Sequence, residues 1–300
     1  MHIPDNFLST PVWAGMDVIS APVFGLLARR AGREMEESRI PLLGVLGAFV
    51  FAAQMINFPV GIGTSGHLVG GALLACTVGP AAASIVMTAI LVIQAFVFQD
   101  GGVLALGANV FNMALAGVLA GYLPYRLWNG SRSRNAAVFV GGFLSVVVSA
   151  SLALTELLIS GVRMPRSVVL ISLALFCVSG LLEGAITMTV MGAIERLNPG
   201  WVQKPGGERR SALVILAGGA LLLAGVGFVF ASTNPDGLER LGLQLGIAAQ
   251  TTLQAPLADY TMPFTNSAWV RKASAGLAGL LAVYGCLSLL GRLILRQRNA

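Results

Sequence analysis

The two histidines of this 300-residue chain are placed where both could bind one metal ion. His2 directly follows Met1, and His67 ends the charge-free turn Pro59-Val-Gly-Ile-Gly-Thr-Ser-Gly-His67. A metal held by the α-amine of Met1, the amide nitrogen between the two residues and the His2 imidazole closes two small chelate rings, and His67 would supply a fourth nitrogen. Planar sets of nitrogens that include an ionised amide are characteristic of Cu(II) and Ni(II), with Co(II) next in affinity. The pair therefore predicts a metal site.

Two further expectations follow from this chemistry. The metal must displace protons from the amine, the amide and the imidazoles, so its affinity should fall in acid. Zn(II) or Cu(I) would be expected to recruit thiolates, whereas Cys76, Cys177 and Cys286 stand alone in apolar runs without CxxC spacing and are interpreted as packing residues. The plainer alternative is a solvated His2 and a hydrogen-bonded structural His67.

The composition predicts a membrane protein. Hydrophobic residues make up 56% of the chain, charged residues 11%, and the mean hydropathy is +0.80, while soluble domains are about 25% charged. Uncharged stretches approach the ~20 residues that span a bilayer. We predict an all-α, polytopic helical bundle with about nine membrane-spanning helices, at residues 10–28, 40–57, 67–79, 80–98, 104–125, 136–159, 167–192, 211–231 and 273–291.

The distribution of Lys and Arg predicts the orientation. If the spans alternate in direction, 14 Lys and Arg residues fall on one side of the membrane and only 5 on the other. The 14 lie in the segments after the first, fifth, seventh and ninth spans. The side with more Lys and Arg should be cytoplasmic. We therefore expect a cell-membrane protein whose N-terminus and His67 face outward and whose C-terminus faces the cytoplasm. This distribution accounts for the net charge of +6 without a nucleic-acid partner. Metal ligands that face outward favour metal uptake over metal efflux.

The N-terminus carries no signal-peptide pattern. No Lys or Arg precedes the first span, and no small-residue cleavage site follows it. A bulky His2 should also hinder removal of the initiator methionine. We therefore expect a free amine on Met1.

Segment composition indicates three parts: residues 1–195 with closely spaced spans, a polar Pro/Gly-rich linker at 196–210, and a two-span part at 211–300 with a long outer loop. The span at 67–79 is short and is bounded by Gly66 and by Gly79-Pro80, a pattern that marks substrate sites in transporters. Small residues at 70–75 and 116–121 would allow helices to approach closely.

Acidic residues inside the spans allow a competing function. Asp17, Glu156 and Glu183 could form a proton or cation path, but we favour structural roles, with Glu156 paired to Arg163 or Arg166. Polar residues near the outer span ends could bond the histidine rings or join helices: Asn57, Thr64, Ser65, Gln94, Asn109 and Asn112.

The chain has no motif for ATP use or hydrolysis. Its two lysines stand in Lys204-Pro205 and Lys272-Ala273, so a Walker A motif is missing, as are HExxH and a nucleophile motif. We expect a protein that is not an enzyme and that binds no organic cofactor.

Several motifs resemble the CbiM/NikM family, the substrate-binding (S) components of energy-coupling factor (ECF) importers for cobalt and nickel. They recur in order: MHIPDNFLS at 1–9, the run at 39–60, TSGHLVGGA at 64–72, QDGG at 99–102 and GANVFNM at 107–113. The part from 211 onward, with PDGLE at 235–239 and ADYTMP at 258–263, resembles the small NikN-type subunit.

The resemblance implies a seven-span S component in which the terminal amine, an amide nitrogen and two histidines hold the metal, at Met1, His2 and His67. A transmembrane coupling (T) subunit and cytoplasmic ATP-binding subunits would then drive transport. Asn6 replaces an expected glycine, although Asn tolerates a left-handed turn.

We therefore expect a membrane component that captures Ni(II) or Co(II) as transported substrate at the extracytoplasmic face. The alternatives are a proton-coupled secondary transporter using Asp17 or Glu183, and a membrane metal sensor. Both metals suit these nitrogens. Asp236, Glu239 and Asp259 could attract cations, and contact between the C-terminal part and the metal stays an open question.

Overall fold

The computed structural model describes residues 1–34, 37–61, 63–128, 133–197, 210–264 and 266–299. Its α-helices are α1 (Thr10–Glu34), α2 (Ile40–Gln54), α3 (Gly71–Val78), α4 (Pro80–Ile93), α5 (Leu106–Asn109), α6 (Val118–Trp128), α7 (Arg134–Ile159), α8 (Arg166–Leu197), α9 (Arg210–Val226), α10 (Gly237–Leu245) and α11 (Ala268–Asn299). The predicted all-α class is confirmed. Most of the predicted linker, residues 198–209, lies outside the described residues.

Short elements complete the described part of the chain. Two π-helical segments continue α4 and join α5 to α6: η2 (Gln94–Phe98) and η3 (Val110–Gly117). Three 3₁₀ turns are η1 (Glu37–Arg39), η4 (Gly227–Val229) and η5 (Ala258–Tyr260). One hairpin, which the hydropathy pattern did not predict, pairs β1 (Phe58–Gly61) with β2 (Thr64–Gly66) in antiparallel register.

Each of the nine predicted spans contains a helix. Among the described residues, six helical segments are long and apolar enough to cross a bilayer: Thr10–Glu34, Pro80–Phe98, Leu106–Trp128, Arg134–Ile159, Arg166–Arg196 and Ala268–Arg296. Ile40–Gln54 and Leu213–Val229 are shorter apolar helices. The third predicted span holds only the eight residues of α3, about 12 Å of helix against a hydrocarbon core of about 30 Å.

Helix α3 is short because glycines in unusual backbone conformations bound it. Gly70 at its start has φ 78°, and Gly79 at its end has φ 85°, so both lie in a region that glycine adopts without strain. The carboxylate of Glu183 on α8 accepts the N–H groups of Val69 and Gly70 at 2.7 and 2.8 Å. These bonds fix the turn that connects His67 to α3.

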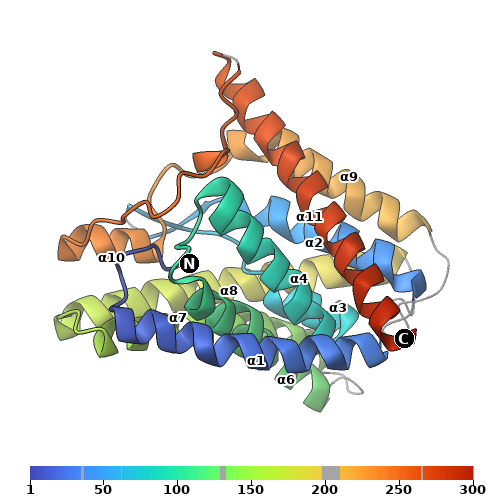
Figure 1. Cartoon of the computed structure of the whole chain (residues 1–300), viewed down its shortest axis with the longest axis horizontal. Coiled ribbons are helices and arrows are strands. Elements are labelled where there is room, and N and C mark those ends of the chain that lie inside the picture. Colours follow the sequence, from blue (N-terminus) through green and yellow to red (C-terminus); the bar gives the residue numbers. More distant parts are fainter. Residues whose placement is uncertain (35–36, 62, 129–132, 198–209, 265, 300) are drawn as a thin grey trace.

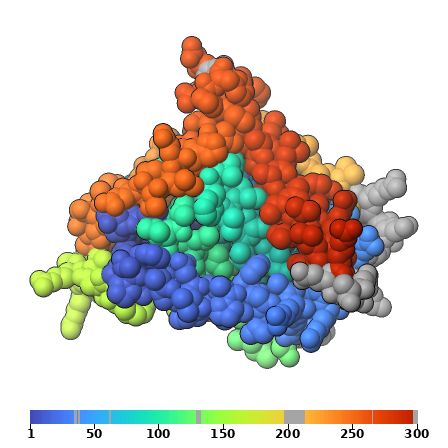
Figure 2. Space-filling view, in the orientation of Figure 1, coloured from blue at the N-terminus to red at the C-terminus, as the bar shows by residue number. Residues whose placement is uncertain are grey.

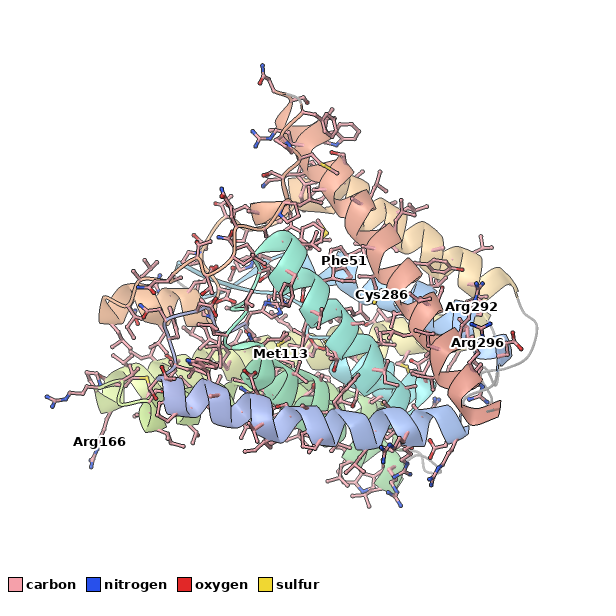
Figure 3. All side chains as sticks on the ribbon, in the orientation of Figure 1. Phe51, Met113, Arg166, Cys286, Arg292 and Arg296 are labelled. Atoms are coloured by element: carbon pink, nitrogen blue, oxygen red, sulfur yellow. The ribbon has the colours of Figure 1, made fainter. Side chains whose placement is uncertain are left out.

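The two chain termini lie apart. The N-terminus lies inside the fold beside α10, and the C-terminus lies at the far end of α11 (Figure 1). Figure 3 shows Arg166, at the start of α8, at one end of the long axis of the molecule, and Arg292 and Arg296 toward the opposite end, where the C-terminus lies. Large apolar side chains are exposed along the outer helices, Val18 on α1 by 74% and Leu281 on α11 by 74%, as expected where lipid takes the place of water.

Small residues set the closest helix contacts. A Cβ on Gly121 of α6 would lie 2.9 Å from Ala72 of α3, so the two predicted small-residue motifs pack on each other within this chain. Helices α9 and α11 pack along α2. There, Gly44 receives the ring of Tyr284 and Gly47 receives Leu287, while Gly279 of α11 receives Phe51.

Candidate metal centre

Hydrogen bonds between side chains and the backbone fix the first residues of the chain inside the bundle. Asn109 accepts a hydrogen bond from the N–H of Ile3 at 2.8 Å and donates one to its carbonyl at 3.0 Å. Asp5 accepts the N–H groups of Leu104 and Ala105 at 2.8 and 3.3 Å. Asn6 has φ 74°, so the expectation that Asn keeps the left-handed turn is confirmed. Met1 and His2 are thereby held in place.

Close approach of the 101–102 backbone to the N-terminus requires glycine. The N–H of Gly102 donates to the Ile3 carbonyl at 2.9 Å, and a Cβ at Gly102 would lie 2.6 Å from the Asp5 nitrogen. The QDGG motif therefore forms the wall of the pocket that receives residues 1–5.

The structure brings Met1, His2 and His67 together. The Met1 nitrogen lies 2.8 Å from Nε2 of His67, and the two imidazole rings are stacked with centroids 5.2 Å apart at an interplanar angle of 11°. All three residues are buried. Nδ1 of His67 lies 2.9 Å from the Leu68 carbonyl, which as an acceptor places the ring proton on Nδ1 and leaves the Nε2 lone pair toward Met1. Their role as metal ligands stays a prediction.

Two carboxylates also reach these ligands. Asp236, from the C-terminal part, forms a very short ion pair with the Met1 amine, and Asp100 lies 2.9 Å from Nδ1 of His2. Nε2 of His2 is buried and has no hydrogen-bond partner among the described residues. The C-terminal part thus contacts a candidate ligand directly, which the sequence did not establish.

The local electrostatics keep His67 neutral. Burial, followed by the positive charge of the Met1 ammonium, lowers the pKa of His67 to about 3. Burial alone would raise the pKa of Asp236, but the Met1 ammonium leaves it below its ordinary value, and contact with His2 likewise leaves the pKa of Asp100 lowered. A neutral imidazole beside two carboxylates is suited to bind a cation.

Cavities reach the centre from two directions. One of about 370 Å³ is lined by His2, Asp5 and Gln250, and another of about 440 Å³ is lined by His67, Asn57 and Lys272. Asp100, Asp236 and Glu239 line both cavities. The centre is therefore buried yet reachable by small hydrated ions. In the part of the chain that the structure describes, no three His, Cys, Asp or Glu side chains form a metal-ligand group; the candidate set instead combines side chains with main-chain nitrogens.

The predicted second shell takes other roles. None of the six predicted amide and hydroxyl side chains has a hydrogen bond to a histidine ring among the described contacts. Asn109 holds the Ile3 backbone instead, and Gln94 donates to Gln54 at 2.9 Å and to Tyr260 at 3.3 Å. Sequence reasoning missed Asp100 and Tyr260 as partners, although both lie in motifs that carried the family resemblance.

The acidic residues of the helices bind local donors. Asp17 accepts the N–H of Gly107 at 2.8 Å, and Glu183 accepts the two N–H groups before α3. Glu156 accepts from Asn112 at 2.9 Å. The predicted pairing with Arg163 or Arg166 is wrong, because both arginines are exposed and Glu156 is buried against the Asn112 amide. Cys76, Cys177 and Cys286 are free thiols.

Together, the fold and the site define a class of protein. It is a multi-pass helical membrane protein with a buried N-terminal amine beside a loop histidine. Residues 2–201 match the family described as "Cobalt uptake substrate-specific transmembrane region" (CbiM), and residues 210–296 match the PDGLE domain. The chain belongs to the CbiM family and carries a PDGLE domain after it.

Similar proteins and a similar solved structure are consistent with this family. The "Putative fused nickel transport protein NikMN" of Archaeoglobus fulgidus is 34% identical over 94% of this chain and 95% of that protein. The "Cobalt transport protein CbiM" of Acetoanaerobium sticklandii is 35% identical over 52% of this chain and 67% of that protein. The crystal structure of a truncated transition metal transporter aligns with a TM-score of 0.58 at 33% identity, covering 65% of this chain and 99% of that chain.

Proposed function

We propose that this protein captures Ni(II) or Co(II) at the extracytoplasmic face, as the substrate-specific component of an ATP-driven ECF importer. The observation that carries the proposal is the 2.8 Å separation between the Met1 nitrogen and Nε2 of His67. Metal–nitrogen bonds of about 2 Å at right angles place two ligand nitrogens about 2.8 Å apart. The apo geometry therefore already suits adjacent corners of one coordination plane.

Completing that plane requires one local movement. The imidazole nitrogen that closes a six-membered chelate ring with the His2 amide is Nδ1, which contacts Asp100 in this structure. Turning the His2 ring would bring Nδ1 to the metal and let the Nε2–H, which has no partner among the described residues, donate to Asp100. The site lies at the cavities that would admit the ion. The names of the nickel and cobalt transport proteins among its relatives support these two metals as substrates.

The energy source and the partners are part of the same proposal. Since this chain has no Walker A motif, a separate T subunit and cytoplasmic ATP-binding subunits would supply the work, docking at the Arg-rich end. The proton-coupled alternative gains no support, because Asp17 and Glu183 are engaged with backbone N–H groups.

The test is equilibrium binding of Ni(II) and of Co(II) to the purified full chain. Three forms are compared with the native chain: His67→Ala, a form with two residues added before Met1, and a control with two residues added after Ala300. Two residues are needed, because a single addition makes histidine the third residue and lets it chelate with the amine and two amides. Mass spectrometry verifies each N-terminus.

We expect one ion per native or C-terminally extended chain, and loss of binding of about 100-fold or more in the other two forms, since each removes a ligand. Undiminished binding by the N-terminally extended form would rule out the amine as a ligand and refute the proposed site.

A further inference from the structure

The carboxylate of Asp236 binds the Met1 amine in a fixed orientation. Its Oδ2 forms the ion pair with Met1, while its Oδ1 accepts the N–H groups of Leu238 and Glu239, both at 2.8 Å, as the N-cap of α10. Glu239 completes the capping box by accepting the Asp236 N–H at 2.9 Å. One oxygen fixes the helix start, so the other is aimed at the amine.

The same loop is bonded to the hairpin that carries His67. Ser65 donates its N–H to the Pro235 carbonyl at 2.9 Å and its hydroxyl to the Asn234 carbonyl at 2.7 Å. Arg240 donates to the Gly63 carbonyl at 2.6 Å. These bonds join the start of α10 to β2 and to the residue before it, so the position of the Asp236 carboxylate is fixed relative to His67.

A bound divalent ion would need a negative partner here. An M(II) ion with one ionised amide, one amine and two neutral imidazoles carries a net charge of +1, and burying an uncompensated charge is costly. The Asp236 carboxylate brings the charge of this group to zero. A coordinated primary amine keeps two N–H bonds, so Asp236 can continue to accept a hydrogen bond from it after the metal binds.

A second contact anchors the C-terminal part at His2. Asp259 and Tyr260 both have positive φ, 53° and 52°, a conformation that residues other than glycine seldom adopt. This turn stacks the Tyr260 ring on Phe98, with centroids 4.6 Å apart, and places its hydroxyl 2.5 Å from Oδ2 of Asp100. The other oxygen of Asp100 faces His2.

The space-filling view shows the C-terminal segment, in orange, lying over the N-terminal residues and the segment around residue 100 (Figure 2). We propose that this PDGLE segment completes the metal site: Asp236 is a positioning residue that holds the amine on His67 and neutralises the bound ion, and Tyr260 positions His2 through Asp100. This inference rests on the proposed function.

The experiment compares Asp236→Asn with Glu37→Gln in the full chain, together with Tyr260→Phe and His67→Ala. Asn can still cap α10, so Asp236→Asn removes the charge and keeps the shape. Glu37 is exposed in η1 and lines neither cavity of the candidate site, so its replacement is a control that removes an equal charge. The measurements are the affinity for Ni(II), the d–d absorption spectrum of the Ni(II)-loaded protein, and the thermal unfolding of the apo protein.

We expect Asp236→Asn to weaken Ni(II) binding at least about tenfold and to shift the absorption band, because the amine loses its orientation. Tyr260→Phe should weaken binding severalfold, and Glu37→Gln should bind like the native chain. Thermal unfolding of all variants should remain cooperative.

The inference is overturned if Asp236→Asn leaves affinity and spectrum unchanged, or weakens binding no more than Glu37→Gln does. His67→Ala separates the two claims. Loss of binding in His67→Ala with native behaviour of Asp236→Asn refutes only this inference, whereas native binding by His67→Ala refutes the proposed function itself.

Discussion

Carboxylates bind polar groups in two regions of this protein and have different partners in each. At the candidate metal centre, the half-buried Asp100 contacts the imidazole of His2 and the buried Asp236 contacts the amine of Met1. Within the helical bundle, Glu183 accepts backbone N–H groups and Glu156 accepts an amide of Asn112. Both regions satisfy their charges, but only the first satisfies them with groups that a metal can also bind.

The difference shows that burial of an acid inside a membrane protein does not by itself mark function. A carboxylate that binds backbone N–H groups stabilises one conformation, because those groups have no other use. A carboxylate that binds an amine or an imidazole fixes the position of a group that can also bind a metal ion, as the proposed site requires. The partner, rather than the depth, distinguishes the two roles.

The strongest test of this distinction is Glu183→Gln. Its amide can accept only one of the two N–H groups before α3 and places an N–H₂ against the other, so we expect the free energy of unfolding to fall by about 2–3 kcal/mol. Thermal unfolding in detergent measures the loss. If stability is native and transport alone fails, Glu183 belongs with the functional acids and the comparison breaks down.

Asp100→Asn should show the opposite pattern. It removes the carboxylate that faces His2, so affinity for Ni(II) should fall about tenfold, while thermal stability should change less than in Glu183→Gln because Asp100 is partly exposed. Calorimetric titration gives the affinity. An increase in affinity would mean that Asp100 competes with the metal for the imidazole and does not assist binding.

Acid should destabilise the apo protein through His67. Its pKa is about 3 when folded, against an ordinary value of 6.5, so between these values the unfolded chain binds more protons and the free energy of unfolding falls as the pH decreases. The ceiling is about 1.4 kcal/mol per pH unit. Unfolding at pH 7 and pH 5 should show this loss in the native chain and not in His67→Gln. Equal losses would place the titration elsewhere.

Glu156→Gln should have the smallest effect. Glutamine retains an oxygen for Asn112, so we expect less than about 1 kcal/mol change in stability and native affinity for Ni(II). A measured drop in affinity would connect this part of the bundle to the metal centre and blur the division between the two regions.

Much of the architecture could be predicted because hydropathy and small-residue spacing act locally. The nine apolar segments all contain helices, and the left-handed turn at Asn6 follows from a property of asparagine. The proximity of Met1, His2 and His67 was also predicted, because one shared metal ion would bring their nitrogens together, the orientation rule places them on one side, and the family resemblance implies the same three residues.

The remaining contacts depend on tertiary distance. Asp236 meets Met1 across 235 positions of sequence, and Tyr260 meets Asp100 across 160, and no periodic pattern encodes such pairs. The pairing of Glu156 was predicted from nearby arginines, but a buried amide on another helix took their place. The β1–β2 hairpin was missed because a glycine-rich turn carries little strand signal.

The seam between α2 and α11 has a consequence for how this chain can be divided and recombined. Each helix offers glycine where the other offers bulk, Gly47 beneath Leu287 and Gly279 beneath Phe51, so sliding either helix by one turn would set bulk against bulk. A C-terminal part supplied as a separate polypeptide should reassemble in one register only. Chimaeras between relatives should fold when α2 and α11 are exchanged together and misfold when one helix is exchanged alone. The two helices would therefore have to change together.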